Sequence, residues 1–233
     1  VCKGFFYDIG NAAPYIIKTL RGNARDAQRK AAKAAVHRRT KGRGGLEREK
    51  KMSGEIRRVK RELAYEGTVL KVYKDYMEFE NGGSEVWDYI HHNGAAAVLP
   101  VLDDGRVLLV SQYRSSVDRD TLEIPAGKLD YIEEPMIACA GRELEEETGY
   151  KSDNLERLLT IRTTVALCNE KIDIYVAKDL KPSRQHLDEG EYVTVSAYTI
   201  EELKAKIFAG EIEDSKTIAA VFAYADKCAS ANV

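Results

Sequence analysis

Long apolar runs are missing from this sequence of 233 residues. No stretch approaches the roughly 18 residues that a membrane-spanning helix needs, so we expect the protein not to associate with a membrane in this way. A short apolar segment followed by a small-residue cleavage site is missing as well, and the sequence therefore predicts no secretory signal.

Cysteine is scarce, and the four cysteines lie far apart with no CxxC spacing: Cys2, Cys139, Cys168 and Cys228. This pattern argues against a zinc cluster and is typical of a reducing compartment, so we expect a cytoplasmic protein. The adjacent His91 and His92 have no further ligands at metal-site spacing. No GxxxxGK(S/T) sequence occurs, which excludes a Walker-type phosphate loop.

The composition that is present is globular, but its charge is uneven. Hydrophobic residues make up 44% and charged residues 32%, which is typical of one sizeable soluble domain with a small second one. Residues 1–51 hold 14 Lys and Arg against 4 Asp and Glu, and the remainder holds 22 against 34. The net charge of −2 therefore conceals a basic segment joined to an acidic one near Met52.

The basic segment, residues 1–51, is rich in Ala, Lys and Arg and poor in large apolar side chains. Such a segment buries too little surface to offset the entropy of ordering, so we interpret it as a disordered extension. Two alternatives stay open: an arm that touches RNA or a membrane surface, and an upstream extension that is not part of the functional protein.

Strand signals begin after this segment. Two strand-like runs flank Asn81-Gly82, a dipeptide typical of hairpin turns, and predict a small antiparallel β region over residues 52–92. A second pair of runs flanks Asp104-Gly105. Residues 171–180 and 191–198 are further strand candidates.

Helix signals are few. Thr199 and Glu202 form a capping box for a helix that ends near Gly210, and residues 215–229 predict a last helix with one buried face. Strands interspersed with few helices favour an α/β (α+β) domain over residues 93–233, in which helices cover a mixed sheet.

One more helix is predicted between Pro135, which suits a first turn, and Gly149, which suits a C-terminal end. In it, Ile137, Ala140 and Leu144 share a face that can pack on a core.

Four glutamates crowd the end of this helix: Glu143, Glu145, Glu146 and Glu147. At about 100° per residue, Glu145 points to solvent and the other three share an arc beside the apolar face. Two carboxylates about 4 Å apart repel by roughly 4 kcal/mol at the effective dielectric of a protein surface. Mg²⁺ binds carboxylate oxygens and keeps positions for water and phosphate. The three glutamates are therefore a candidate metal site, with a solvated acidic surface as the alternative.

The longer segment LEIPAGKLDYIEEPMIACAGRELEEETGY, residues 122–150, resembles the Nudix box Gx5Ex7REUxEExGU, in which U is apolar. The second half of the box is in register from Arg142, and Glu134 lies eight residues before it. Gly127 lies seven residues before Glu134 instead of six. Either the loop has one extra residue or Glu133 is the early glutamate.

The segment before the box, SQYRSSVDRDTLEIPAGKLD at residues 111–130, is similar to the corresponding segment of the ADP-ribose pyrophosphatase branch of Nudix hydrolases. The resemblance to this branch runs from about residue 52 to about residue 224. The resemblance implies a Nudix-type α/β/α sandwich and a Mg²⁺-dependent hydrolysis, with Mn²⁺ as an alternative. The expected substrate is a nucleotide sugar, first ADP-ribose, which gives AMP and ribose 5-phosphate. Val165 and Ala166 stand where the branch usually has a proline, so GDP-mannose or another nucleotide sugar is the alternative substrate. The branch also implies a homodimer built by the N-terminal strands.

Residue by residue, the resemblance implies that Glu143, Glu146 and Glu147 hold the metal. Arg142 orients these carboxylates and, with Glu147, belongs to the catalytic group. The general base is expected in the acidic loop, at Glu191 or at Glu189. The backbone carbonyl of Ala126 is a further candidate metal ligand. The candidate substrate contacts are Arg114, Glu123, Trp87 and Glu170, and the box loop is held by Gly127 and Glu134.

A non-catalytic module that binds nucleotide sugars is the competing class of function. The intact Glu143, Glu146 and Glu147 argue against it, and no helix-turn-helix pattern follows the domain as an output. Nucleic acid is not expected as a partner, and only the basic residues 1–51 would favour it.

Overall fold

The computed structural model describes residues 56–68, 70–131, 133–187 and 190–231. Two compact units divide the chain, one up to Tyr89 and one from Ile90 onward. The predicted extension over residues 1–51 lies outside the described residues, as does the start of the predicted β region. No helix in the described part of the chain is long and apolar enough to span a membrane.

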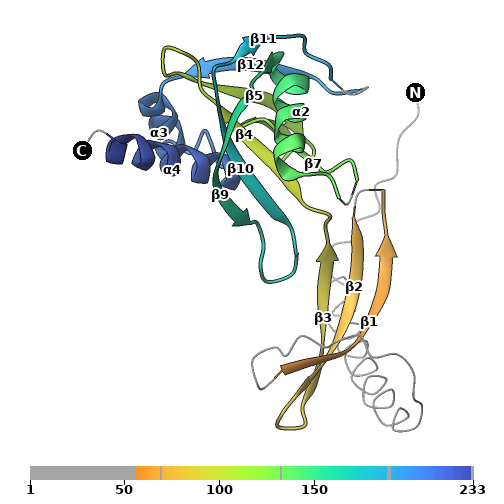
Figure 1. The fold of residues 1–233 in the computed structure, drawn as a ribbon. Helices are drawn as coiled ribbons and strands as arrows, with labels where there is room; N and C mark the ends of the chain where they lie inside the picture. The colour runs from red at the N-terminus through yellow and green to blue at the C-terminus, as the bar shows by residue number, and fades with distance from the viewer. Residues whose placement is uncertain (1–55, 69, 132, 188–189, 232–233) are drawn as a thin grey trace, which may run out of the picture. The chain divides into compact units, whose positions relative to one another are not determined.

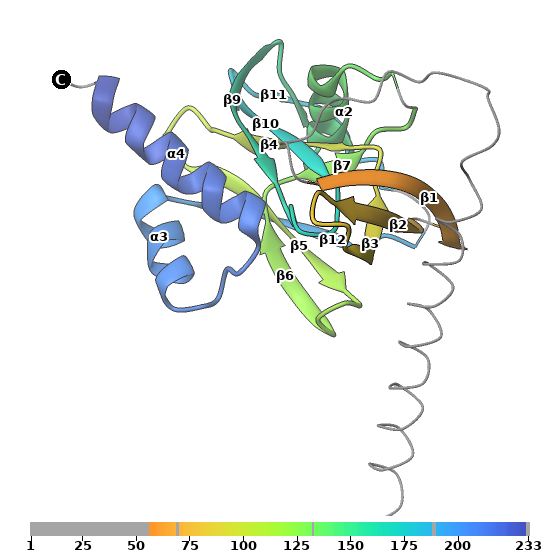
Figure 2. The same cartoon turned by 90° about the horizontal axis from the view of Figure 1, so that it is seen from below.

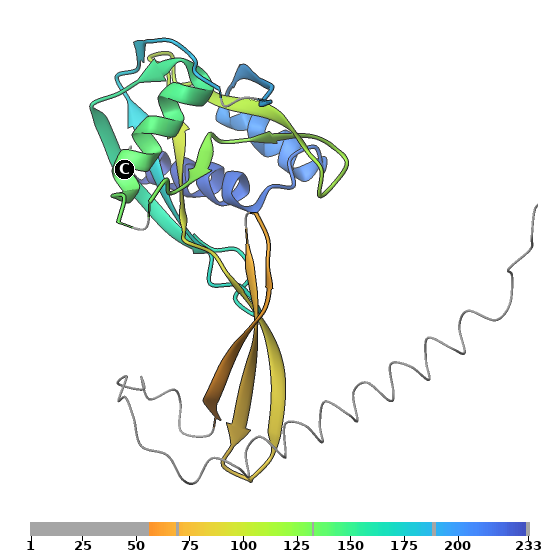
Figure 3. The same ribbon diagram turned by 90° about the vertical axis from the view of Figure 1, so that its right-hand side faces the viewer.

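The first unit contains an antiparallel sheet in the order β1-β2-β3, whose strands are β1 (Ile56–Glu66), β2 (Lys71–Phe79) and β3 (Ser84–His91) (Figure 3). The turn between β2 and β3 lies at Asn81-Gly82, where Gly82 has a φ of 78° and donates its N–H to Phe79 O at 3.0 Å. This confirms the hairpin predicted from the dipeptide, because glycine adopts a positive φ without steric cost.

The second unit is built on two sheets (Figure 1). One is mixed, in the order β7-β4-β10-β9, with β4 parallel to β10 and the outer pairs antiparallel; its strands are β4 (Ala95–Pro100), β7 (Ala126–Lys128), β9 (Asn154–Arg162) and β10 (Lys171–Lys178). The other is antiparallel, in the order β12-β5-β6, with strands β5 (Val107–Arg114), β6 (Arg119–Glu123) and β12 (Val193–Tyr198). A short pair joins β8 (Tyr150–Lys151) to β11 (Lys181–Pro182).

The predicted turn at Asp104-Gly105 is present, with Gly105 at a φ of 84°. The strands on either side, β4 and β5, belong to different sheets, but next to the turn Val101 and Val107 form an antiparallel bridge and Leu102 donates its N–H to Arg106 O at 2.8 Å. The turn therefore closes a short hairpin, beyond which the two strands pass into different sheets.

Alternate residues of β4 face two separate cores. Ala97 and Leu99 belong to the core that contains residues of α3 (Ile200–Phe208) and α4 (Ser215–Ala231). Ala96 and Val98 belong to the core formed with α2 (Met136–Thr148). All four side chains are buried, as expected of a strand covered on both faces. Figure 2 shows α2 on one side of β4 and β10, with α3 and α4 on the other. This confirms the predicted α/β/α sandwich with a mixed sheet.

The helix ends agree with the sequence signals, with one correction. Pro135 is the N-cap of α2, and Gly149 ends it in the left-handed region with a φ of 70°. The predicted capping box of Thr199 and Glu202 is present at α3. Ile137, expected on the buried face of α2, is 48% exposed. It lies in the first turn, and the buried face is made instead by Cys139, Ala140, Glu143, Leu144, Glu147 and Thr148.

Candidate active site

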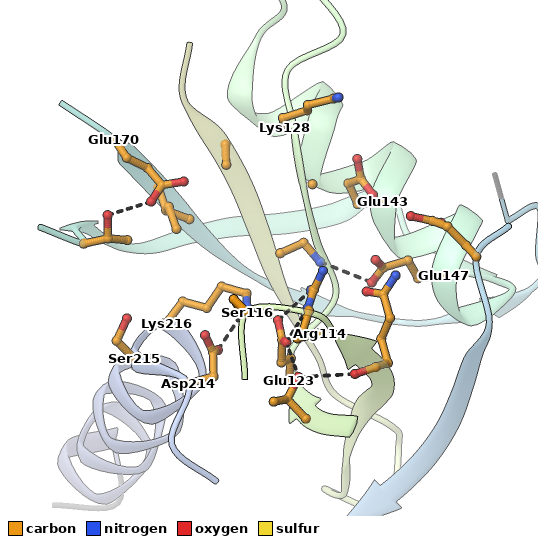
Figure 4. A pocket seen from close by; sticks show the side chains of 18 of the residues that line it. Arg114, Ser116, Glu123, Lys128, Glu143, Glu147, Glu170, Asp214, Ser215 and Lys216 are labelled. Atoms are coloured by element: carbon orange, nitrogen blue, oxygen red, sulfur yellow. Dashed lines mark hydrogen bonds and ion pairs between the residues drawn. The ribbon is translucent and has the colours of Figure 1, made fainter. Parts of the chain in front are cut away.

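A cavity of about 830 Å³ opens in the second unit between α2, the strands β5 to β7, the start of α4 and one end of β10. Figure 4 shows Glu143 and Glu147 at one end of it, Lys216 and Asp214 at the other, and Arg114 with Glu123 between them. The lining comes from segments that lie far apart in the sequence and is mostly polar or charged, which favours a polar, charged ligand.

The two glutamates at the α2 end are buried, with 8% of Glu143 and 5% of Glu147 exposed. Burial raises the pKa of Glu143 to about 7, and repulsion from Glu146 and Glu191 adds to this against the attraction of Arg142. Burial also raises the pKa of Glu147 to about 8, with repulsion from Glu143 as the next cause. The negative charge of this pair is therefore incompletely compensated by the protein's own groups.

The strand β7 approaches these carboxylates very closely. Ala126 donates its backbone N–H to Glu147 Oε2 at 3.2 Å. A β-carbon built on Gly127 would lie 1.9 Å from Glu143 Oε1, so no other residue fits here while Glu143 keeps its position. The backbone of β7 and the two glutamates thus form a narrow, oxygen-rich corner of the cavity.

Arg142 connects the acidic groups around this corner. Its Nη1 donates to Glu143 Oε1 at 2.7 Å and to Glu146 Oε2 at 2.9 Å. Its Nε donates to Glu134 Oε1 at 3.3 Å, and its Nη2 donates to the backbone oxygen of Lys128 at 3.2 Å. Burial alone would lower the pKa of Arg142, but these acidic partners outweigh it and raise the pKa, so the guanidinium stays charged.

Of the two candidates for the early glutamate, Glu134 is the one beside Arg142. It is buried and also accepts the backbone N–H of Asp130 at 2.8 Å, whereas Glu133 is exposed. Burial would raise the pKa of Glu134, but the hydrogen bonds from Arg142 and Asp130 lower it. The geometry therefore favours a box loop with one extra residue between Gly127 and Glu134.

The corner fits a divalent cation in its chemistry. Glu143, Glu147 and the neighbouring Glu146 offer hard oxygen ligands. The pKa values of the two buried carboxyls are raised by burial and then by repulsion from neighbouring glutamates, and a nearby cation would favour their ionised forms. Within residues 56–231 as described, no three acidic, histidine or cysteine side chains already converge as a ready-made ligand set. Arg142 occupies oxygens of Glu143 and Glu146, so it competes for these ligands.

The acidic loop docks on the C-terminal turn of α2. Gln185 donates its side-chain amide to Glu147 O at 2.6 Å, and His186 donates its backbone N–H to Glu146 O at 3.0 Å. Glu191 lines the cavity, and its charge helps to raise the pKa of the buried glutamates. Glu189, the other candidate base, lies outside the described residues.

Arg114 and Glu123 form a two-pronged ion pair in the cavity wall. Arg114 Nε and Nη2 donate to Glu123 Oε1 and Oε2 at 2.7 and 2.8 Å. Lys216 also donates to Glu123 Oε2. Burial would raise the pKa of Glu123, but Arg114 and Lys216 outweigh it and lower the pKa to about 2. Glu123 is therefore a buried anion held by two cations.

The side chain of Glu170 lines the far end of the cavity. Thr163 Oγ1 donates to Glu170 Oε2 at 2.6 Å, and His92 Nε2 lies 3.5 Å from Glu170 Oε1. Gly94 donates its backbone N–H to His92 Nδ1 at 3.1 Å, which assigns the ring proton to Nε2. His92, which the sequence gave no reason to single out, is thus part of the cavity wall.

Trp87 belongs to the first unit, on β3. Its indole N–H donates to Glu85 Oε2 at 3.2 Å, and its ring lies 6.3 Å from that of Phe79. The cavity lining, as described in the second unit, does not include Trp87. Its expected contact with substrate stays a prediction.

Several polar residues of the lining were not identified by sequence reasoning, among them His92, Thr163, Asp214 and Lys216. The start of α4 did carry a signal, since Asp214 is a good N-cap residue and accepts the backbone N–H of Thr217 at 3.0 Å. Nothing in the sequence pattern indicates that Lys216 reaches β6, because that contact joins residues 93 positions apart.

The comparisons with known proteins agree with this architecture. The family model described as NUDIX domain matches residues 91–221. A solved structure described as an ADP compounds hydrolase superposes with a TM-score of 0.70 and covers 77% of this chain and 97% of its own, at 22% sequence identity. This likeness shows the fold.

Sequence relatives add to the family match. The chain is 38% identical to the methanol dehydrogenase activator of Bacillus methanolicus and 35% identical to the ADP-ribose pyrophosphatase of Bacillus subtilis. Each alignment covers 72% of this chain and 91% of the relative. The ADP-ribose pyrophosphatase of Mycobacterium tuberculosis is 31% identical, over 70% of this chain and 79% of its own length. The chain belongs to the NUDIX family and is a Nudix hydrolase of the ADP-ribose pyrophosphatase-like branch.

Proposed function

We propose that the protein hydrolyses the pyrophosphate bond of nucleotide sugars with Mg²⁺, and that ADP-ribose is its substrate, giving AMP and ribose 5-phosphate. The observation that carries the proposal is the corner of Glu143 and Glu147 beside β7, two buried carboxyls with raised pKa values. Relatives named ADP-ribose pyrophosphatase at 35% and 31% identity support the choice of substrate.

In this proposal Glu143, Glu146 and Glu147 would hold the cation, with the backbone carbonyl of Ala126 as a further ligand. The bound cation supplies positive charge that polarises phosphoryl oxygens and makes the attacking water more acidic. Arg142 holds Glu143 and Glu146 in place. Glu134 in turn holds Arg142. Mn²⁺ is an alternative cation, since it also prefers oxygen ligands.

Glu191 is the proposed general base. Its carboxylate accepts a proton from the water, whose oxygen bonds to phosphorus while the bridging P–O bond breaks. Its place on the lining, close enough to raise the pKa of Glu143 and Glu147, supports this choice. Glu191→Gln is expected to lower kcat by about a hundredfold or more, as loss of a general base does, and Glu189→Gln is the matched control that leaves kcat unchanged. The reverse pattern would assign the base to Glu189.

Arg114 and Glu170 are proposed to contact the substrate from opposite parts of the cavity, with Arg114 near the phosphates and Glu170 toward the sugar hydroxyls. Arg114 suits an anion because the guanidinium presents several N–H donors. Glu123 serves by holding Arg114. Trp87 and the first unit are proposed to act in a homodimer, where the β region over residues 52–92 completes the substrate site.

A panel of substrates tests the proposal. Purified protein with Mg²⁺ is incubated with ADP-ribose, GDP-mannose and UDP-glucose, and the phosphomonoester products are separated by chromatography. AMP from ADP-ribose, at a higher kcat/KM than any product of the other two, supports the proposal. Reaction in ¹⁸O-labelled water shows from the labelled product which phosphorus is attacked. Binding of ADP-ribose without release of AMP contradicts it.

GDP-mannose is the second candidate substrate. The chain is 33% identical to the GDP-mannose pyrophosphatase of Yersinia enterocolitica, over 58% of this chain and 73% of the relative. Val165 and Ala166 replace the proline that is usual in the ADP-ribose branch, and Val165 is 80% exposed. A higher kcat/KM for GDP-mannose in the same panel would establish this alternative.

A further inference from the structure

Lys216 is an unusual cation in this molecule, because it is buried and lies at the start of a helix. Only 10% of its side chain is exposed. Its ammonium pairs with Glu123 Oε2 and lies 3.0 Å from Asp214 Oδ2. Since two carboxylates neutralise this one charge, Lys216 has little to offer a substrate phosphate directly.

The carboxylate of Glu123 is completely used by its neighbours. Oε1 accepts from Arg114 Nε and from Thr121 Oγ1 at 2.6 Å. Oε2 accepts from Arg114 Nη2 and from Lys216. A carboxylate has about four acceptor positions, so each is filled and the group has no freedom to rotate.

Arg114 is held edge-on by this carboxylate. The two-pronged pair uses two of the five N–H groups of the guanidinium and leaves its other edge for a further acceptor. The Arg114 side chain is 38% exposed, in contrast with 6% for Glu123. Figure 4 shows Arg114 between Glu123 and Glu147. The charge of Arg114 opposes part of the rise in the pKa of Glu147, which burial dominates.

We propose that Lys216 is a positioning residue: by holding Glu123 Oε2 from the start of α4, it fixes the guanidinium of Arg114 in the orientation that meets the substrate's phosphates. The proposal rests on the function proposed above and adds to it a residue on α4 that acts on the substrate through Glu123 and Arg114.

Ile124, the residue after β6, has a second attachment to α4 in which Lys216 takes no direct part. Ile124 donates its backbone N–H to Thr217 Oγ1 at 2.8 Å, and Thr217 Oγ1 donates to Asp214 Oδ2 at 2.6 Å. Replacing Lys216 removes one partner each from Glu123 and Asp214 but leaves the hydrogen bond from Ile124 to Thr217 available to hold the end of the strand. Lys216→Met therefore tests the orientation of the Arg114 guanidinium in a protein that is expected to fold.

A double-mutant cycle in kcat/KM tests the proposal. Lys216→Met is expected to lower kcat/KM for ADP-ribose by roughly tenfold, and Arg114→Ala by roughly a hundredfold. Because Lys216 acts through Arg114, adding Lys216→Met to Arg114→Ala should cause no further loss. Lys216→Arg, which keeps the charge, should restore most of the activity.

Lys227→Met is the matched control. Lys227 lies on the same helix and pairs with Glu156 at 2.7 Å, but both side chains are exposed and outside the cavity lining described above. Its replacement should leave kcat/KM unchanged. Equal losses from Lys216→Met in the wild-type and Arg114→Ala backgrounds would overturn the proposal, because they would show that Lys216 acts independently of Arg114.

A spectroscopic measurement separates this proposal from the proposed function. The Nε–H of Arg114, held by Glu123, should give a slowly exchanging NMR signal in the wild-type protein and a rapidly exchanging one in Lys216→Met. If the panel shows no hydrolysis but this signal changes, the proposed function fails and the positioning role stands. If Lys216→Met leaves the signal unaltered, the positioning role fails whatever the activity.

Discussion

Gly127 and Glu143 approach each other so closely that a side chain on the first would occupy the place of the second. A β-carbon on Gly127 would lie 1.9 Å from Glu143 Oε1 and 2.2 Å from Glu143 Cδ. The atoms in the way are the end of a flexible side chain, so Glu143 can rotate aside with its helix in place. Glycine is therefore needed at position 127 to keep the carboxylate of Glu143 in its observed position.

Gly127→Ala is therefore expected to separate activity from stability. The variant should fold with nearly the wild-type melting temperature, whereas kcat should fall by roughly a hundredfold because Glu143 no longer faces the metal corner. Steady-state kinetics with ADP-ribose and thermal denaturation measure the two quantities.

Gly141→Ala is the control for this substitution. Gly141 lies in α2, and its added β-carbon would meet nothing within 4 Å. Alanine in a helix interior is favoured over glycine by about 0.5–1 kcal/mol, so this variant should be slightly stabilised and fully active. Normal activity in Gly127→Ala would show that the position of Glu143 does not matter for catalysis.

Glu147→Gln should lose activity and gain stability. Glu147 is buried and its pKa is raised to about 8, so its ionised form is disfavoured in the folded protein. A carboxyl with a raised pKa stabilises the fold below its unfolded pKa and loses that contribution as pH rises toward 8. At pH 8 without metal, the neutral Gln should therefore raise the melting temperature, and Mg²⁺ should stabilise the wild-type protein but not the variant.

Glu145→Gln is the matched control on the same helix. Glu145 accepts a hydrogen bond from the Ser183 hydroxyl and does not line the cavity described here. Its replacement should leave both the hydrolysis rate and the stabilisation by Mg²⁺ unchanged. If Mg²⁺ raised the melting temperature of Glu147→Gln as much as that of the wild-type protein, Glu147 would not be a metal ligand.

The buried Glu123 predicts an acid-labile contribution to stability. Its pKa is lowered from 4.5 to about 2 in the folded protein, a difference on the order of 3 kcal/mol. Because the folded pKa is the lower one, this contribution is present above about pH 4.5 and is lost as pH falls toward 2. Denaturant unfolding between pH 6 and pH 2.5 measures it.

Glu123→Gln should be less stable than the wild-type protein at pH 6, since Arg114 and Lys216 then lack their shared anion. Its unfolding free energy should also fall less steeply between pH 4.5 and pH 2.5. A pH dependence parallel to that of the wild-type protein would show that other carboxyls account for the acid lability.

Local patterns in the sequence were enough to predict the hairpin at Asn81-Gly82, the capping box at Thr199 and the ends of α2. Each depends on residues within a few positions of one another, where backbone chemistry decides the outcome. The Asp104-Gly105 turn shows the limit. Its local signal was right, but the pairing of the flanking strands depends on β10, which lies between β4 and β9 and is far away in sequence.

The site shows the same limit. The spacing in the box identified the crowded glutamates and Arg142, and the cavity brings them together with Arg114, Glu123 and Glu170. The Lys216 contact joins positions 93 residues apart, and the exposure of Ile137 depends on where the first turn of α2 lies relative to the sheet. Neither follows from spacing along the chain.

Removal of residues 1–51 is expected to leave hydrolysis intact. Among the residues that the structure describes, the cavity lining runs from His92 to Lys216, and the family model matches residues 91–221. A chain that begins at Met52 should therefore show the kcat and KM of the full chain for ADP-ribose, measured at equal protein concentration so that any dimer forms equally.

The basic charge of residues 1–51 suggests RNA binding as another role, which can be tested by comparing the full chain with the chain that begins at Met52. If the segment touches RNA, only the full chain should be retained on single-stranded RNA, and its binding should weaken steeply as salt rises, because counterions are released from phosphates. Equal weak retention of both chains would exclude that role. A large rise in KM on truncation, with kcat unchanged, would instead place the segment at the substrate site and contradict the expectation of intact hydrolysis.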